Sequence, residues 1–103
     1  MNLKGTLPLL ILHALENGPK HGYRIACDIK SKSKGVLDFK EGTLYPALHE
    51  QENRGLVESY EQTENGRRRR YYRLTEDGRK VLAKERVEWR AFSRAVTHVL
   101  EGA

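Results

Sequence analysis

Cysteine, clustered histidine and long apolar runs are scarce in this chain of 103 residues, and each scarcity excludes a class of protein. The one cysteine, Cys27, excludes an internal disulfide and a cysteine-based zinc site, and it is typical of a reducing compartment. The four histidines are scattered without the spacing of metal ligands, at His13, His21, His49 and His98. We therefore expect no metal and no cofactor, and no residue pattern indicates an enzyme.

An apolar stretch near the start covers only residues 7–12, which is too short to span a bilayer. A polar GPKHG segment follows at residues 18–22, and no small-residue cleavage site of a secretory signal is present. The sequence therefore indicates a cytoplasmic protein without a membrane partner.

Positive charge is abundant but unevenly placed, with a formal net charge of +5. Residues 20–40 carry six bases and two acids, residues 41–66 one base and six acids, and residues 67–90 ten bases and four acids. Two basic segments thus flank an acidic one, which suits a protein whose flanks hold phosphates. With 38% hydrophobic residues, the chain predicts one domain with a small core that a partner must supplement.

Residues 57–74 predict a β-hairpin, because Asn65-Gly66 tolerates the positive φ angles of a two-residue type I′ turn. Counting outward from this turn predicts the cross-strand pairs Glu64–Arg67, Gln62–Arg69, Tyr60–Tyr71, Glu58–Arg73, Ser59–Tyr72 and Val57–Leu74. The tip then carries four cations that we assign to DNA contact, Arg67, Arg68, Arg69 and Arg70. The alternative is a solvated edge that resists strand addition.

A helix precedes this hairpin, and Pro46 locates it because proline is tolerated in the first turn. We expect the helix to begin near Gly42 or Thr43 and to end at Gly55. Its inward positions are Leu44, Ala47, Leu48 and Gln51. Its outward face then supplies the candidates for contact with a DNA groove, Thr43, Tyr45 and His49.

An earlier helix is predicted from His21 to Ser31, and its free N–H groups could receive a phosphate. Tyr23 either adds a hydroxyl to that site or is a core residue with a wet tip. With the basic linker, this region completes the predicted DNA contacts through His21, Tyr23, Lys32, Lys34 and Lys40.

The first helix is expected to start at a Thr6 cap, with Pro8 in its first turn and Gly18 beyond its end. Leu9 and Leu12 lie off its core-facing stripe, so the helix is apolar over most of its circumference. A helix that is apolar all round is buried all round. We therefore expect a second subunit to cover Leu9 and Leu12.

A long helix is predicted after the Thr75 cap, with no proline up to Glu101. About 25 residues of helix span about 37 Å, whereas the preceding 75 residues would have a radius of gyration of about 11 Å. The helix must therefore project, and apolar residues at heptad spacing predict that it forms a dimer interface through Leu82, Trp89, Phe92, Val96 and Val99. Trp89 and Phe92 are either plain dimer core or the lining of a cavity for a flat aromatic effector.

Three segments together resemble the PadR family of bacterial transcriptional regulators: HGYRI at residues 21–25, GTLYPALHEQENRGLVES at 42–59 and GRRRRYYRLTEDGRKVL at 66–82. The resemblance implies a dimeric repressor of the short subgroup, with an N-terminal winged helix and one C-terminal dimerisation helix. It also implies that the GTLYPAL helix enters the major groove and that the hairpin flanks the site. The HEQEN segment departs from the family pattern, so sequence specificity cannot be carried over.

The sequence thus predicts a mainly α fold with a small β-hairpin, divided into a winged helix-turn-helix at residues 1–74 and a dimerisation helix at residues 75–103. The expected function is that of a homodimeric repressor that binds double-stranded DNA at a palindromic operator. A small hydrophobic or aromatic effector would release it. The alternative is a winged-helix module for protein interaction without sequence-specific DNA binding.

Overall fold

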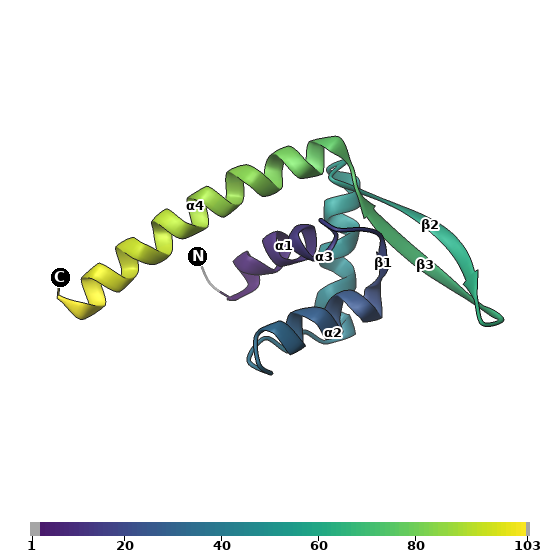
Figure 1. Cartoon of the computed structure of the whole chain (residues 1–103), viewed down its shortest axis with the longest axis horizontal. Coiled ribbons are helices and arrows are strands. Elements are labelled where there is room, and N and C mark those ends of the chain that lie inside the picture. The colour runs from purple at the N-terminus through teal and green to yellow at the C-terminus, as the bar shows by residue number, and fades with distance from the viewer. Residues whose placement is uncertain (1–2, 103) are drawn as a thin grey trace.

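The computed structural model describes residues 3–102, so the predicted ends of the two regions at residues 1–2 and 103 lie outside it. The chain is mainly helical, with a small antiparallel sheet and a long C-terminal helix (Figure 1). The elements follow in the order α1 (Leu3–Ala14), β1 (Lys20–His21), α2 (Gly22–Lys32), α3 (Glu41–Asn53), β2 (Val57–Glu64), β3 (Arg67–Leu74) and α4 (Glu76–Glu101).

The hairpin of β2 and β3 has the predicted register in each of the pairs named above, from Glu64 opposite Arg67 at the tip to Val57 opposite Leu74 at the root. Asn65 and Gly66 have φ angles of 52° and 78°, as a type I′ turn requires. The strand β1 was not predicted. It pairs with β3 at Tyr71 and Tyr72, so that β3 is the central strand of a sheet ordered β1-β3-β2.

Two prolines lie deeper in their helices than the sequence analysis expected, although α3 begins within one residue of the predicted Gly42. Thr6 lies inside α1 rather than at its cap, and both Pro8 and Pro46 occupy the sixth residue of their helices. A proline in that position loses the bond to the carbonyl four residues earlier but leaves the following turns intact. The helices begin earlier because backbone bonds such as Leu44 N to Lys40 O (2.9 Å) already close the first turn of α3.

The core lies where α1, α2 and α3 meet the root of the hairpin and the first half of α4. Its buried apolar residues are Leu7, Leu9, Ile11, Leu12, Ala14, Leu15, Ile25, Ile29, Leu44, Leu48, Leu56, Val57, Tyr72, Leu74 and Leu82. Gln51 is buried among them on α3, and neither atom of its side-chain amide has a hydrogen-bond partner within the described part of the chain. Apart from this amide and the Tyr72 hydroxyl, the buried side chains of this core are apolar.

The core corrects part of the predicted dimer interface. Leu12 and Leu82 are 0% and 2% exposed within the single chain, so neither has surface left for a partner. Leu9 is buried too, although it lies at the edge of a groove described below. The apolar circumference of α1 is covered by the chain's own α4 and α3, which sequence periodicity could not reveal.

The helix α4 starts at the predicted cap, where the Thr75 hydroxyl accepts a hydrogen bond from Gly78 N at 3.0 Å. Gly78 presses on the chain before β2, because a Cβ there would lie 2.0 Å from the Leu56 carbonyl oxygen. Further along, Arg86 binds both carboxylate oxygens of Glu16 at 2.6 and 2.9 Å. These contacts fix the first half of α4, while its second half extends away from the other elements (Figure 1).

Candidate nucleic-acid interface

Residues of α2, α3 and β3 meet around one open hollow of about 280 Å³. Six of the residues predicted to contact DNA line it together, which are His21, Tyr23, Tyr45, His49, Arg69 and Arg70. The hollow also includes the N-terminus of α2, where free backbone N–H groups favour an anion. Its lining is thus suited to hold a phosphate beside the exposed face of α3.

His21 caps α2, and its Nδ1 atom accepts a hydrogen bond from Arg24 N at 3.1 Å. Burial and the nearby Arg69 and Arg24 cations lower the pKa of His21, partly opposed by Glu64. A neutral ring whose Nδ1 accepts must carry its proton on Nε2. The rings of His21 and Tyr71 are nearly perpendicular, with their centroids 5.5 Å apart, so the cap also joins α2 to the sheet.

Tyr23 is 66% exposed, so the alternative of a core residue is wrong. Its pKa is raised, first because its hydroxyl is hydrogen-bonded to Cys27. On α3, Thr43 and His49 are exposed as predicted, whereas Tyr45 is half-buried. Tyr45 therefore combines a packed ring with a hydroxyl at the hollow.

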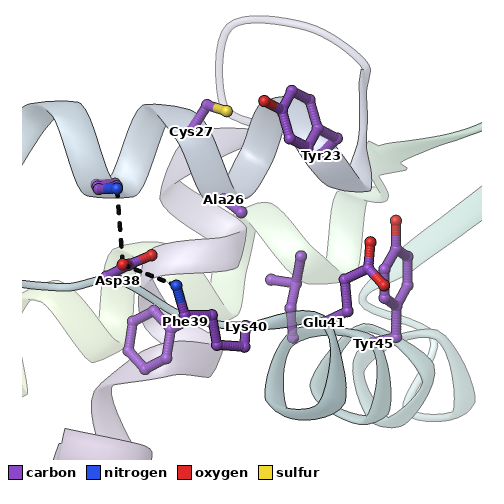
Figure 2. A pocket seen from close by; sticks show the side chains of 10 residues that line it. Tyr23, Ala26, Cys27, Asp38, Phe39, Lys40, Glu41 and Tyr45 are labelled. Atoms are coloured by element: carbon purple, nitrogen blue, oxygen red, sulfur yellow. Dashed lines mark hydrogen bonds and ion pairs between the residues drawn. The ribbon is translucent and has the colours of Figure 1, made fainter.

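A second cavity, of about 240 Å³, separates α2 from the start of α3 (Figure 2). Tyr23 and Cys27 reach it from α2, and Glu41 and Tyr45 from α3. Asp38 lies at its other end between two ammonium groups, 3.1 Å from Lys40 Nζ and 3.6 Å from Lys30 Nζ. The hydrogen bond from Lys40 lowers the pKa of Asp38 below its usual range, so the charge of Lys40 is partly neutralised.

Lys32 and Lys34 do not line the hollow. Lys32 ends α2 and Lys34 follows it in a turn, with a φ of 56°. Since α2 rises about 1.5 Å per residue, these two lysines lie about 15 Å from the hollow at its other end. They are exposed cations, but the fold does not bring them together with His21 and Tyr45.

The hairpin of β2 and β3 is here called the wing, and its four arginines at residues 67–70 differ in their partners. Arg68 pairs with Glu61 at 3.2 Å, and Arg70 donates to Ser59 Oγ at 2.8 Å. Within the region that the structure describes, Arg67 and Arg69 form no ion pair. The wing therefore presents two unpaired cations, one at its tip and one beside His21.

The predicted seam on α4 is partly exposed. Phe92, Val96 and Val99 lie open on the projecting half of the helix, with 41%, 39% and 80% of their surfaces exposed, and Leu100 lies beside them. Trp89 is half-buried, with its ring 6.0 Å from that of Phe92. It also lines an apolar groove of about 430 Å³ between α1 and α4, here called the α1–α4 groove, with Thr6, Leu9, Leu10, His13, Leu37 and Arg86.

Three residues at this site escaped the sequence analysis. Gly22 allows α3 to approach α2, and Glu52 and Ser59 bind one another near Arg70. The sequence analysis placed only Ser59, opposite Tyr72 in the register of the hairpin, and that pairing does not involve Glu52. The others depend on tertiary distances that no local pattern contains.

Within residues 3–102, none of the helices combines the length and apolar character that a bilayer crossing requires. The same residues contain no group of three acidic, histidine or cysteine side chains arranged to hold a metal ion.

An exposed helix face beside a basic antiparallel hairpin, with a second helix packed behind it, defines a winged helix-turn-helix protein. Residues 11–84 match the Transcriptional regulator PadR-like family, so the chain belongs to that family. It is therefore a transcriptional regulator of the PadR type.

Relatives support the same assignment. The chain is 34% identical to Transcriptional regulator Rv3488 of Mycobacterium tuberculosis, over 96% of this chain and 87% of that one. A PadR family regulator from Clostridium difficile is similar in structure, with a TM-score of 0.79 and 33% identity over 93% of this chain and 99% of that one. Bacillus subtilis PadR, solved in complex with operator DNA, shares the fold with a TM-score of 0.70 and 24% identity over 77% of this chain and 45% of that chain.

Proposed function

We propose that the protein is a homodimeric repressor that binds double-stranded DNA at a palindromic operator. The observation that carries this proposal is the convergence of His21, Tyr45, His49 and Arg69 on one hollow from three separate elements. Membership in a family of transcriptional regulators and the shared fold of Bacillus subtilis PadR, solved with operator DNA, support it.

The proposed binding mode follows from the geometry of the hollow. The exposed residues Thr43 and His49 read base edges from α3 in the major groove, and the Tyr45 hydroxyl faces the hollow. A backbone phosphate occupies the hollow, where the Nε2–H of His21 and the guanidinium of Arg69 donate to it. The wing tip with Arg67 follows the neighbouring backbone.

A second copy of the chain is the proposed partner of the projecting half of α4. Phe92, Val96 and Val99 form an apolar stripe that a folded monomer leaves in water. The α1–α4 groove offers an apolar surface of similar character on the same chain. A two-fold arrangement places the stripe of each copy against the other, and its symmetry requires two inverted half-sites.

Repression is the proposed outcome because a bound dimer blocks its site by occupancy alone. The α1–α4 groove supports a further element of the proposal, the release of DNA by a small hydrophobic or aromatic effector. Its apolar lining includes the indole of Trp89, on which a flat ring stacks. Such a ligand acts only if it binds the DNA-free form more tightly.

The decisive experiment measures binding of the purified protein to duplex DNA enriched from a random library, and to an unselected duplex of equal length. We expect tight binding to the selected duplex and a steep loss of affinity between about 50 and 200 mM salt. A winged-helix module for protein interaction would enrich no sequence and would bind both duplexes equally weakly. Sedimentation equilibrium of the complex then gives the number of chains per duplex.

A further inference from the structure

Arg70 is tied to α3 through a side-chain relay. Its Nη2 atom donates to Ser59 Oγ at 2.8 Å, and the Ser59 hydroxyl donates in turn to Glu52 Oε2 at 2.5 Å. Arg70 Nη2 also lies 3.7 Å from the same carboxylate oxygen. Both hydrogen bonds are charge-assisted, which makes them stronger than bonds between neutral groups.

The relay crosses three elements. Glu52 is near the end of α3, Ser59 is on β2 and Arg70 is on β3. The buried ring of Tyr72 lies across from Ser59 and fixes the root of the hairpin against the core. The relay is therefore placed to set the angle between the wing and the helix that reads bases.

The other wing arginines have no such connection. Arg68 pairs with Glu61 on the neighbouring strand, which holds the two strands together but does not reach a helix. For Arg67 and Arg69, the described residues supply no acidic partner. The run of four arginines is thus divided into unpaired cations and cations already bound to the protein.

We propose that Arg70 is a positioning residue rather than a phosphate contact, and that Glu52 and Ser59 act with it to hold the wing at its working angle to α3. The inference rests on the proposed DNA binding. Arg67 and Arg69 then supply the charge that meets phosphates. Glu52 is an acid whose presence strengthens specific DNA binding, although it carries the same charge as DNA.

The two possible roles of Arg70 predict opposite effects on DNA affinity when the Glu52 charge is removed. If Arg70 were a phosphate contact, Glu52 would compete with DNA for it. Removing that negative charge would then tighten binding to every sequence. If the relay positions the wing, the same change loosens the wing and weakens binding to the selected sequence.

The test compares Glu52→Gln, Ser59→Ala and Arg70→Ala in the full chain on the selected and unselected duplexes. We expect each to weaken binding to the selected duplex about tenfold, the scale of one charge-assisted hydrogen bond. The slope of log affinity against log salt stays unchanged, and the double variant Ser59→Ala with Arg70→Ala is no weaker than either single variant. Thermal melting of each variant verifies that it is folded.

Two matched variants serve as controls. Ser59→Thr keeps the hydroxyl on a strand that accepts β-branched residues, so we expect it to retain the binding to the selected duplex that Ser59→Ala loses. Glu61→Gln removes an acid from the wing outside the relay, so it leaves the preference for the selected duplex intact.

Three results would decide against the inference. Tighter binding by Glu52→Gln, a slope reduced by about 0.9 in Arg70→Ala, or a failure of Ser59→Thr to restore binding would each overturn it. Failure of the proposed function is distinguishable, because the wild-type protein itself would then show no preference for the selected duplex over the unselected one.

Discussion

Gly22 and Tyr45 are in such close contact that a Cβ on Gly22 would lie 2.7 Å from the phenolic oxygen of Tyr45. The missing side chain lets the ring of Tyr45 lie against the first turn of α2. The two helices of the DNA-binding motif are thereby locked at their crossing, and the Tyr45 hydroxyl is held at the hollow.

Gly22→Ala should therefore displace Tyr45 more than it unfolds the protein. The group that must move is the end of a side chain, so we expect a loss of stability near the low end of the 1–3 kcal/mol typical of overpacking. Affinity for the selected duplex should fall about tenfold, the scale of one lost base or phosphate contact. Urea unfolding and DNA titration of the same sample measure both effects.

Gly42→Ala is the control for folding, since nothing lies within 4 Å of a Cβ at Gly42. Alanine there should stabilise the protein by about 0.4–1 kcal/mol, because it restricts the unfolded chain. Unchanged DNA binding by Gly22→Ala would show that the position of Tyr45 does not matter.

The paired variant Arg67→Ala with Arg69→Ala should weaken binding to all DNA sequences to a similar extent. Each phosphate contact contributes about 0.9 to the slope of log affinity against log salt, so the slope should flatten by about 1 to 2 units. Arg73→Ala is the control, because Arg73 pairs with Glu58 at 2.8 Å at the root of the wing. An unaltered slope in the paired variant would remove the wing tip from the interface.

Trp89→Glu should dissociate the proposed dimer, because two unpaired carboxylates buried at one seam cost several kcal/mol. Sedimentation velocity at micromolar concentration measures the change in mass. Val87→Glu is the control, since Val87 is 65% exposed and lies on the opposite side of α4 from Val96. An intact dimer in Trp89→Glu would refute the assigned seam.

The proposed effector is tested through the same residue. A planar aromatic compound that enters the α1–α4 groove should quench Trp89 fluorescence saturably and weaken DNA binding by linkage. Absence of quenching across a panel of such compounds would leave a DNA-binding protein regulated by its abundance alone.

Stability should fall as the pH drops below neutrality, in part through His13. Burial, followed by the Arg86 guanidinium that contacts its Nδ1 atom, lowers the pKa of His13. The unfolded chain, with a histidine pKa of about 6.5, then binds more protons than the folded one. Stability is therefore present above that value and is lost as the pH falls through the lowered pKa of the folded state.

His13→Gln keeps an acceptor for Arg86 but does not titrate. We expect the difference in unfolding free energy between about pH 7.5 and pH 5.5 to shrink in this variant. It should not vanish, because the pKa of His21 is also lowered. Urea unfolding at both pH values measures the difference, and an equal difference in both proteins would contradict the assignment.

Gln51→Met should raise stability by about 1–3 kcal/mol, because it removes a buried amide without hydrogen bonds and keeps a similar volume. Chemical unfolding provides the measurement. A loss of stability would indicate that a buried water satisfies the Gln51 amide.

Local rules determined the hairpin but not the packing around it. Asn65-Gly66 fixed the turn, and counting residues from that turn gave the register, which the structure confirms. The predicted start of α1 and the first-turn position of Pro46 were wrong, because a proline excludes one hydrogen bond and not a whole earlier turn. For both prolines, the error was to extend a local rule about one hydrogen bond to a whole turn of helix.

The interface predictions failed where they depended on which surfaces the chain itself covers. Leu82 was assigned to the dimer by its heptad spacing and Leu12 because it lies off the core-facing stripe of its helix, yet tertiary packing buries both within one chain. The contact of Gly22 with Tyr45 joins neighbouring elements, and the relay from Arg70 to Glu52 joins residues 18 apart in the sequence. A single sequence contains no signal for such distances, so the DNA contacts themselves remain predictions.

Gly78 packs against the Leu56 carbonyl at the start of α4. The helix of 26 residues is about 39 Å long, so a change of about 5° in the tilt of the whole helix would move its far end by roughly 3 Å. In the proposed dimer, two copies of α4 set the separation of the base-reading helices, which must match the distance of about 34 Å between half-sites. In that proposed dimer, the packing of α4 at Gly78 would contribute to the operator spacing that the protein accepts, and a ligand that tilts α4 would move both α3 helices out of register with the half-sites.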